Sequence, residues 1–323
     1  MAAFLFALIS MPVFAQIPEL EKQGWCEGVK IRFFAGGKEG DGFAAIVHRG
    51  ALAAARDLGA DVEYVFSGWD SQIMTQQLRE AVAQEPDGIA MMGHPGSEAI
   101  MPLAAEAAEK GIIMMYQNVD VPDVRAAYGG GYVGAQLAAQ GRALGEEAIR
   151  QFGLTAGDKV IVQVNLAQRE RAQRELGVWE RLEEDGIEVI HMEGNPAWAA
   201  DPNLAIPTVV ASLTANPDVK MVVFPGGQAL GNTQTYFEAA GLTAGQVKAI
   251  GFDTNEFIMN GFEDGWIHLT SDQQPFLQGY LPILSICQTA KLGLAPMNVD
   301  TGAGFIDVNN YQQVRDLANA GYR

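Results

Sequence analysis

Alternating strand-like and helix-like segments run through almost the whole chain, and they limit its fold more than any other feature of the sequence. The first half contains four apolar runs typical of strands, "KIRFFAGG" from Lys30, "DVEYVF", "DGIAMMGH" and "IIMMYQNVD". An amphipathic segment typical of a helix follows each of the first three. Because the strand runs are almost continuously apolar, we expect a parallel sheet covered on both faces.

The same alternation starts again after Gly134. Its strand-like runs are "DKVIVQVN", "IEVIHME", "VKMVVFPGG", "VKAIGFD" and "WIHLTSD". A last long helical run, "FLQGYLPILSICQTAKLG", follows them. No linker rich in serine and glycine separates the two series, and 323 residues suffice for two domains. The sequence therefore predicts an α/β protein of two Rossmann-like lobes, each with a parallel sheet, joined by a short hinge.

The charge balance narrows the choice of partners. Asp and Glu number 39 against 21 Lys and Arg, which gives a formal net charge of -18. Binding to phosphates needs a basic surface, so we expect no nucleic-acid partner.

The first residues have the character of a secretory leader. "MAAFLFALISMPVFAQ" carries no charge and has an apolar core from Ala2 to about Phe14, before a small residue at Ala15. We interpret residues 1–15 as a signal peptide, although the usual basic start is missing, which leaves the translation start open. A buried first helix is the alternative, and Pro12 argues against it. After this segment, the sequence contains no uninterrupted run of about 18 apolar residues, so we expect no membrane-spanning helix.

Export would allow the two cysteines, Cys26 and Cys287, to form a disulfide. Two free buried thiols are the alternative, and sequence spacing alone does not decide between them.

The segment "YGGGYVGAQLAAQGRALG" contains a dinucleotide-binding pattern, with Gly129, Gly131 and Gly134 at the G-x-G-x-x-G positions. In a dinucleotide-binding enzyme these glycines follow the first strand of the unit. Here four strand units precede them, and Pro122 makes the lead-in "VPDVRAAY" a poor strand. An NAD(P)-dependent oxidoreductase is therefore kept only as the alternative function.

Motifs for catalysis are scarce. The sequence has no G-x-S-x-G elbow, and its acidic pairs "EGD" and "EED" lie far apart. None of the four histidines has the spacing of a metal ligand; they are His48, His94, His191 and His268. We therefore expect a protein that is not an enzyme and uses no cofactor and no metal.

Polar and aromatic residues follow the predicted strands, at the edge where ligands of parallel α/β sheets bind. Carboxylate, amide and guanidinium groups can bridge neighbouring hydroxyls of a sugar, and an aromatic ring offers an apolar surface to its C–H face. Phe43 and Trp198 suit the second role, whereas we expect Trp69 and Trp179 to pack in the core. By its position alone, Arg174 suits a salt bridge on the surface of its helix about as well as it suits a contact with ligand. These residues favour a carbohydrate-binding cleft.

With these residues assembled, the chain resembles the periplasmic sugar-binding proteins of ABC importers, in the ribose-binding-like type I group of periplasmic binding proteins. The resemblance covers essentially the whole mature chain. It rests on the order and spacing of motifs that are weak singly, namely "FFAGGKEGDGF", "DGIAMMGHPG", "YQNVD", "YVGAQLAAQG", "RELG", "GFDTN" and "DQQPFLQGYLPI".

The resemblance implies a set of ligand-binding residues, each by its match to the family pattern. These are Asp41, Phe43, His94 and Asn118 from the first lobe, Arg174, Trp198 and Asp253 from the second, and Gln273 at the hinge. The family's second stacking aromatic is Ala44 here, so one ring is lost. The usual Asn-Asp pair is Pro225-Gly226, which puts ribose in doubt and leaves a modified sugar, a polyol or a furanose-like molecule open.

The family also implies two lobes joined by three crossovers. We place these near Tyr128–Gly131, Asp272–Gln273 and Thr301–Gly304. The N-terminal lobe would comprise residues 28–127 and 274–300, and the C-terminal lobe residues 128–273 and 301–323. This arrangement brings Cys287 beside the strand that follows Cys26, and it supports the disulfide.

The implied function is the capture of a small neutral sugar or polyol by hinge closure in the periplasm, followed by delivery to the membrane permease of an ABC transporter. We expect a monomer. A sugar-responsive regulator of the same fold is set aside, because the roughly 27 residues before the first strand show no pair of DNA-binding helices.

Overall fold

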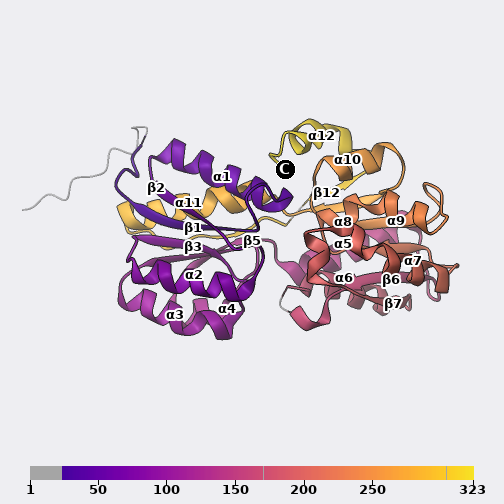
Figure 1. Ribbon diagram of the computed structural model, residues 1–323, viewed down its shortest axis with the longest axis horizontal. Coiled ribbons are helices and arrows are strands. Elements are labelled where there is room, and N and C mark those ends of the chain that lie inside the picture. Colours follow the sequence, from indigo (N-terminus) through magenta and orange to yellow (C-terminus); the bar gives the residue numbers. More distant parts are fainter. Residues whose placement is uncertain (1–23, 170, 303) are drawn as a thin grey trace, which may run out of the picture.

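Two α/β lobes lie side by side in the computed structural model, which describes residues 24–323 except positions 170 and 303 (Figure 1). Each lobe contains a six-stranded sheet, with the strand order β11-β5-β4-β3-β1-β2 in the first and β12-β10-β9-β8-β6-β7 in the second. Neighbouring strands are parallel except β10 and β12, which are antiparallel. The predicted two-lobed α/β fold is confirmed. The leader expected at residues 1–15 lies outside the described residues.

The first lobe alternates strands and helices and later receives a second stretch of chain. Its elements are β1 (Lys30–Gly36), α1 (Gly42–Leu58), β2 (Asp61–Phe66), α2 (Ser71–Ala83), β3 (Gly88–Met92), α3 (Ser97–Glu109), β4 (Ile113–Gln117), α4 (Pro122–Tyr128), β5 (Gly131–Gly134), α11 (Pro275–Leu292) and β11 (Asn298–Asp300). Helices α1 and α11 pack against each other on one face of the sheet, and α2, α3 and α4 lie on the other (Figure 1).

The second lobe follows the same plan. Its elements are α5 (Leu137–Phe152), β6 (Lys159–Val164), η1 (Leu166–Gln168), α6 (Gln173–Glu184), β7 (Glu188–Glu193), η2 (Pro196–Ala199), η3 (Pro202–Ala205), α7 (Ile206–Ala215), β8 (Met221–Val223), α8 (Gly227–Gly231), α9 (Thr233–Ala239), β9 (Lys248–Phe252), α10 (Glu256–Glu263), β10 (Leu269–Asp272), β12 (Gly304–Asp307) and α12 (Tyr311–Asn319).

The sequence of a buried strand explains why helices cover both faces of this second sheet. Successive side chains of a strand point to opposite faces. In β6, Val160 and Val162 join a core with residues of α5 and α6, whereas Ile161 joins a separate core with residues of α7, α8 and α9. A strand with apolar side chains on both faces therefore needs a helical layer on each side.

The chain passes between the lobes three times. The first crossing follows β5 and precedes α5, later than the crossing expected at Tyr128–Gly131, because Gly131–Gly134 forms a strand that pairs with β4 and β11. The second crossing lies between β10 and α11, and the third between β11 and β12. The crossings are tied together: the carboxylate of Asp300 accepts from the backbone N–H of Gln136 at 3.2 Å, and the Gln274 amide donates to the Thr301 carbonyl at 2.9 Å.

Two pairs of helices approach closely through glycines. In the first lobe, a Cβ atom at Gly279 of α11 would lie 1.9 Å from the Val47 carbonyl oxygen of α1. In the second lobe, a Cβ atom at Gly141 of α5 would lie 1.8 Å from the Arg174 carbonyl oxygen of α6. Only glycine allows these backbone contacts. They fix α1 and α6, whose N-terminal ends carry residues of the candidate site.

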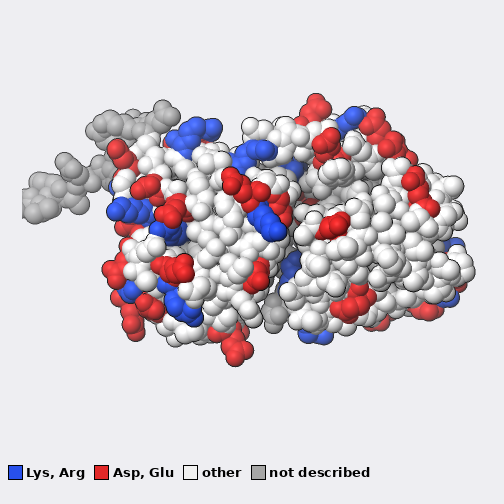
Figure 2. All heavy atoms as spheres, in the orientation of Figure 1, with Lys and Arg blue, Asp and Glu red and all other residues white. Residues whose placement is uncertain are grey.

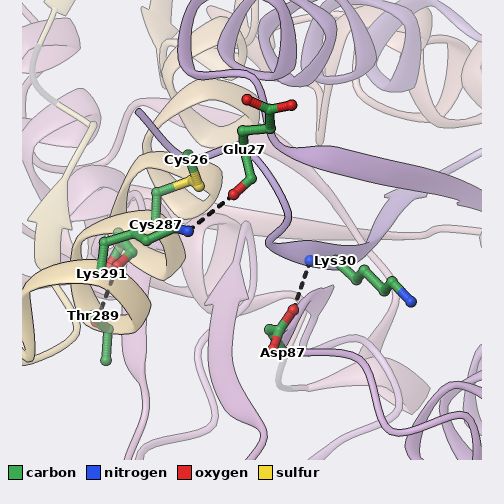
Figure 3. The surroundings of a disulfide bond; sticks show 8 residues. Cys26, Glu27, Lys30, Asp87, Cys287, Thr289 and Lys291 are labelled. Carbon is green, nitrogen blue, oxygen red and sulfur yellow. Dashed lines mark hydrogen bonds between the residues drawn. A yellow bond between two sulfur atoms is a disulfide. The ribbon is translucent and has the colours of Figure 1, made fainter. Parts of the chain in front are cut away.

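A disulfide joins Cys26 to Cys287 (Figure 3), with Cα atoms 5.5 Å apart. It links the segment before β1 to α11, which lies 261 residues later in the chain. The ammonium group of Lys291 donates to the Glu27 carbonyl at 2.9 Å beside the bond. Of the two alternatives left open by the sequence, the structure has the disulfide.

Candidate functional site

A cavity of about 410 Å³ lies between the lobes, where the carboxyl ends of the strands of both sheets meet. The space-filling view shows a furrow between the two lobes on this side of the molecule (Figure 2). Seven of the eight residues expected to bind ligand line the cavity, namely Phe43, His94, Asn118, Arg174, Trp198, Asp253 and Gln273. The fold therefore brings together side chains that are spread over some 230 positions of the sequence.

Arg174 is a deeply buried charged group of the cavity, with 3% of its surface exposed. Its Nη1 lies 3.5 Å from the Asp253 carboxylate, its Nη2 donates to the Pro225 carbonyl at 2.5 Å, and its guanidinium lies 4.6 Å from the centre of the Phe252 ring. Burial, and then the charge of nearby Arg171, lower the pKa of Arg174. An arginine starts so far above neutrality that it stays protonated. The side chain is a fixed hydrogen-bond donor in the cavity wall.

Arg171 and Glu175 form a second ion pair beside it. Arg171 Nη1 lies 3.0 Å from Glu175 Oε1, and Arg171 Nη2 donates to the same Pro225 carbonyl at 3.2 Å. Among the described lining residues, the formal charges are those of Arg171, Arg174, Glu175 and Asp253. Two positive and two negative charges cancel. A neutral ligand suits this wall better than an ion, because an ion would leave one charge uncompensated.

A chain of hydrogen bonds runs from the first lobe through the hinge to the second. The Asn118 amide donates to Gln273 Oε1 at 3.1 Å, and the Gln273 amide donates to Asp253 Oδ1 at 2.5 Å. Gln278 is fully buried and donates to the Gln273 carbonyl at 2.9 Å. Polar groups of both lobes are thus held in one network at the back of the cavity.

Several of these residues adopt backbone angles that are unusual for anything but glycine. Positive φ values occur at Asn118 (64°), Asp253 (75°) and Gln274 (52°), and also at Trp69 (62°). Asn and Asp tolerate this region better than other residues because their short side chains bond locally. Such angles cost free energy, and they cluster here at the ends of strands that face the cavity.

His94 lies on the first-lobe wall just after β3. Burial, and then the charges of Arg171 and Arg174, lower its pKa to about 3. Its Nδ1 is buried without a hydrogen-bond partner in the described structure, while its backbone carbonyl accepts from the Ser71 hydroxyl at 3.2 Å. Near neutral pH the ring is uncharged, so it offers one donor and one acceptor nitrogen.

Asp41 is the one expected ligand residue that does not line the cavity. Its Oδ1 accepts from the Ala44 N–H at 3.5 Å and so caps α1, and its Oδ2 accepts from the Trp69 indole N–H at 2.8 Å. Both carboxylate oxygens already have partners within the protein.

Sequence reasoning missed other lining residues. Trp69 packs against the core of the first lobe, as expected, but it also lines the cavity, and so do Arg171 and Glu175. Their positions in the sequence could have indicated this. Trp69 follows the end of β2, and Arg171 and Glu175 lie beside Arg174 at the start of α6. Trp179, by contrast, packs against the core of the second lobe as expected.

The glycine pattern of the dinucleotide alternative has a structural explanation. Gly131 and Gly134 lie at the two ends of β5 rather than in a loop that opens a helix. A Cβ atom at Gly131 would lie 2.2 Å from the Met297 carbonyl oxygen, and one at Gly134 would lie 2.3 Å from the Tyr132 hydroxyl. The glycines are needed for close packing at the first crossing.

Between residues 24 and 323, positions 170 and 303 aside, no cluster of three His, Cys, Asp or Glu side chains is placed to hold a metal ion. In the same part of the chain, no helix has both the length and the apolar character needed to span a bilayer.

Residues 33–293 match the family model described as a periplasmic binding protein domain. The chain belongs to this family. Among curated proteins it is similar to the xylose/arabinose-binding protein XylF of Sulfolobus acidocaldarius, with 27% identity over 269 residues. That match covers 78% of this chain and 65% of the relative, so the chain spans slightly less than two thirds of that relative's length.

Solved structures share the fold of this chain. A carbohydrate transporter from Acidothermus cellulolyticus 11B, in complex with myo-inositol, superposes with a TM-score of 0.77 at 24% identity over 91% of this chain and 99% of that one. An ABC transporter solute binding protein from Agrobacterium vitis, with bound D-fucose, superposes with a TM-score of 0.78 at 18% identity. The match covers 90% of this chain and 99% of that one. The expected type I periplasmic binding protein fold is confirmed.

Proposed function

We propose that this periplasmic binding protein captures a small neutral sugar or polyol between its lobes, outside the cytoplasm, and delivers it to the membrane permease of an ABC transporter. One observation carries the proposal: the cavity between the lobes combines a charge-balanced polar wall with aromatic rings. Arg174, Asp253 and Gln273 can bridge hydroxyl groups, and Phe43 and Trp198 offer apolar surfaces. XylF is named for two sugars, and the two solved neighbours hold a cyclic polyol and a sugar, which supports this ligand class.

Capture would proceed by hinge closure. A ligand that bonds to both walls stabilises the closed arrangement of the lobes over the open one, and so shifts the population toward it. Asn118, Gln273 and Asp253 link the walls through the second crossing, so a ligand bonded to any of them is coupled to the hinge. No step of this mechanism changes a covalent bond, and we propose that the protein acts as a monomeric binder and not as an enzyme.

The disulfide supports a place outside the cytoplasm, because such bonds persist in oxidising compartments. The proposed leader at residues 1–15 fits the same location. Acidic groups are spread over both lobes on the face shown in Figure 2, and a net charge of -18 disfavours nucleic acid as a partner.

A screen of neutral sugars and polyols by thermal unfolding, followed by calorimetry on the best ligand, tests the proposal. A ligand bound only by the folded state raises the unfolding temperature. Arg174→Ala and Asp253→Ala should each weaken that ligand at least about tenfold. Arg181→Ala on the same helix is the matched control, because Arg181 pairs with Glu146 and Asp185 away from the cavity. Unchanged affinity in both cavity variants, with folding intact, would refute the proposed site.

The oxidoreductase alternative is tested by titration with NADH, because binding changes the fluorescence of the nicotinamide. No change at millimolar protein and cofactor removes it. Of the three glycines on which it rests, Gly129 ends α4 and Gly131 and Gly134 lie in β5, so none opens a helix after a strand and they give it no support.

A further inference from the structure

We propose that Trp69 is a sugar-stacking residue of the cleft, that Asp41 is the residue that positions it, and that together they favour ring-shaped ligands with a C–H face over acyclic polyols. This inference rests on the proposed function and deepens it. It assigns to Asp41 a role different from the direct ligand contact that the family pattern implies.

The contact between the two side chains is specific. Asp41 Oδ2 accepts the Trp69 indole N–H at 2.8 Å, across 28 positions of sequence. The backbone N–H of Trp69 also donates to the Gly36 carbonyl at 3.1 Å. The residue is therefore held at both its backbone and its indole nitrogen.

The surroundings of Trp69 are shaped for this ring. A Cβ atom at Gly36 would lie 2.5 Å from a ring carbon, and one at Gly37 would lie 2.8 Å from the indole nitrogen. The backbone of Trp69 has a φ of 62°, which is unfavourable for a bulky residue. Strained angles persist where the structure around them is fixed, and here the strain places an aromatic ring at a cavity wall.

The ring completes an aromatic surface on the first lobe. Its centre lies 6.0 Å from that of Phe43 and 5.3 Å from that of His94, and all three line the cavity. Ala44, where the family pattern has its second stacking ring, is fully buried and offers none. Trp69, from the end of β2, supplies a ring to the same wall from a different part of the chain.

The hydrogen bond to Asp41 also determines the chemistry that the ring presents. With its only donor occupied, the indole offers the cavity an apolar surface alone. The opposite wall carries Arg171, Arg174, Glu175 and Asp253. A matching ligand has an apolar C–H face on one side and hydroxyl groups on the other, as a cyclic sugar or cyclitol does. An acyclic polyol must be fixed in one conformation to present such a face, which costs conformational entropy.

The first test compares a cyclic ligand found by the screen with an acyclic polyol having the same number of hydroxyls. The wild-type protein should bind the cyclic ligand more tightly than the acyclic polyol. Trp69→Leu should lower the affinity for the cyclic ligand at least about tenfold and change the affinity for the acyclic polyol less than about threefold. Trp69→Phe keeps a ring and should lose less than Trp69→Leu. Trp179→Phe, on the core side of α6, is the matched control and should behave as wild type.

The second test separates the two roles of Asp41. Asp41→Asn leaves one acceptor oxygen for two donors, so it can keep either the cap of α1 or the bond to the indole, and affinity should fall between that of wild type and that of Asp41→Ser. Asp41→Ser keeps the cap, but its side chain is too short to hold the indole, so affinity should fall toward that of Trp69→Leu. Combining Asp41→Ser with Trp69→Leu should add little further loss, because both changes disrupt the same contact.

Different outcomes would contradict the stacking role and the proposed function. If wild type binds no sugar or polyol, the proposed function fails. If wild type binds, but folded Trp69→Leu and Trp69→Phe bind cyclic ligands as wild type does, the stacking role fails. If folded Asp41→Ser keeps full affinity, the positioning role fails. Tryptophan emission gives an independent reading: Trp69→Phe should reduce the ligand-induced change, whereas Trp179→Phe should not.

Discussion

The guanidinium of Arg323 bonds to the fully buried carboxylate of Asp272, with Nη2 and Nε donating to Oδ2 at 2.6 and 3.1 Å. Asp272 ends β10, where the chain passes to the first lobe, and its other oxygen accepts from the Gln274 N–H at 2.8 Å. The same C-terminal segment also contacts the first lobe, because Arg49 of α1 donates to the Ala320 carbonyl at 2.6 Å. The segment thus spans both lobes beside the hinge.

Replacing Arg323 should therefore destabilise the protein. Arg323→Gln leaves a buried carboxylate without its cation, and we expect a loss of about 1–3 kcal/mol in the free energy of unfolding. Urea unfolding followed by circular dichroism measures it. Arg315→Gln is the control on the neighbouring helix, because Arg315 and Glu263 form an exposed pair expected to contribute less than about 1 kcal/mol. Equal effects of the two changes would contradict this prediction.

Loss of the disulfide should have a larger effect. The bond between Cys26 and Cys287 closes a loop of most of the chain, so its removal frees the unfolded state and should cost about 2–5 kcal/mol. The Cys26→Ser, Cys287→Ser double variant and the wild type in dithiothreitol should show the same lowered urea midpoint. The reductant should not affect the double variant. A wild type that is reduced, by thiol titration, yet unchanged in stability would disprove the expected contribution.

The order of strands and helices could be predicted from the sequence because buried parallel strands need apolar residues at nearly every position. The position of the first crossing between the lobes could not be predicted in this way. The glycines around Tyr128–Gly131 suit a hinge, but strand pairing uses only the backbone, and all four residues of β5, Gly131–Gly134, are buried between β4 and β11.

The site could be predicted only in part, for a related reason. Asp253 and Gln273 follow recognisable strand ends, so their meeting at one rim follows from a parallel sheet. The place of Trp69 depends on space beside Gly36 and Gly37 and on the carboxylate of Asp41, some 30 residues earlier. No local pattern around Trp69 encodes those contacts.

Stability should fall as the pH is lowered below about 6.5, in part because of His94. Burial, and then Arg171 and Arg174, lower its pKa to about 3, whereas in the unfolded chain it returns to about 6.5. Between these values the unfolded state binds a proton that the folded state does not, so stability decreases with decreasing pH, by up to about 1.4 kcal/mol per unit. His268, with a pKa lowered to about 4 by burial and by Lys248, acts in the same direction.

His94→Gln should therefore flatten the dependence of stability on pH between about 6 and 4, but not abolish it, because His268 remains. Urea unfolding at several pH values measures the slope. The ring resonances of His94 should show no titration between pH 8 and 5 in nuclear magnetic resonance spectra. A midpoint near 6.5 in those spectra would overturn the assignment of a neutral, buried ring.

The close approach of α5 and α6 should control ligand affinity from outside the cavity. A Cβ atom at Gly141 would lie 1.8 Å from the Arg174 carbonyl oxygen, and one at Gly177 would lie 2.4 Å from the Ala138 carbonyl oxygen. Gly141→Ala and Gly177→Ala must push α6 away, at a cost of about 1–3 kcal/mol in stability. Since α6 carries Arg174, each should also weaken the ligand severalfold by calorimetry. Folded Gly141→Ala and Gly177→Ala proteins with wild-type affinity would show that the position of α6 does not limit binding.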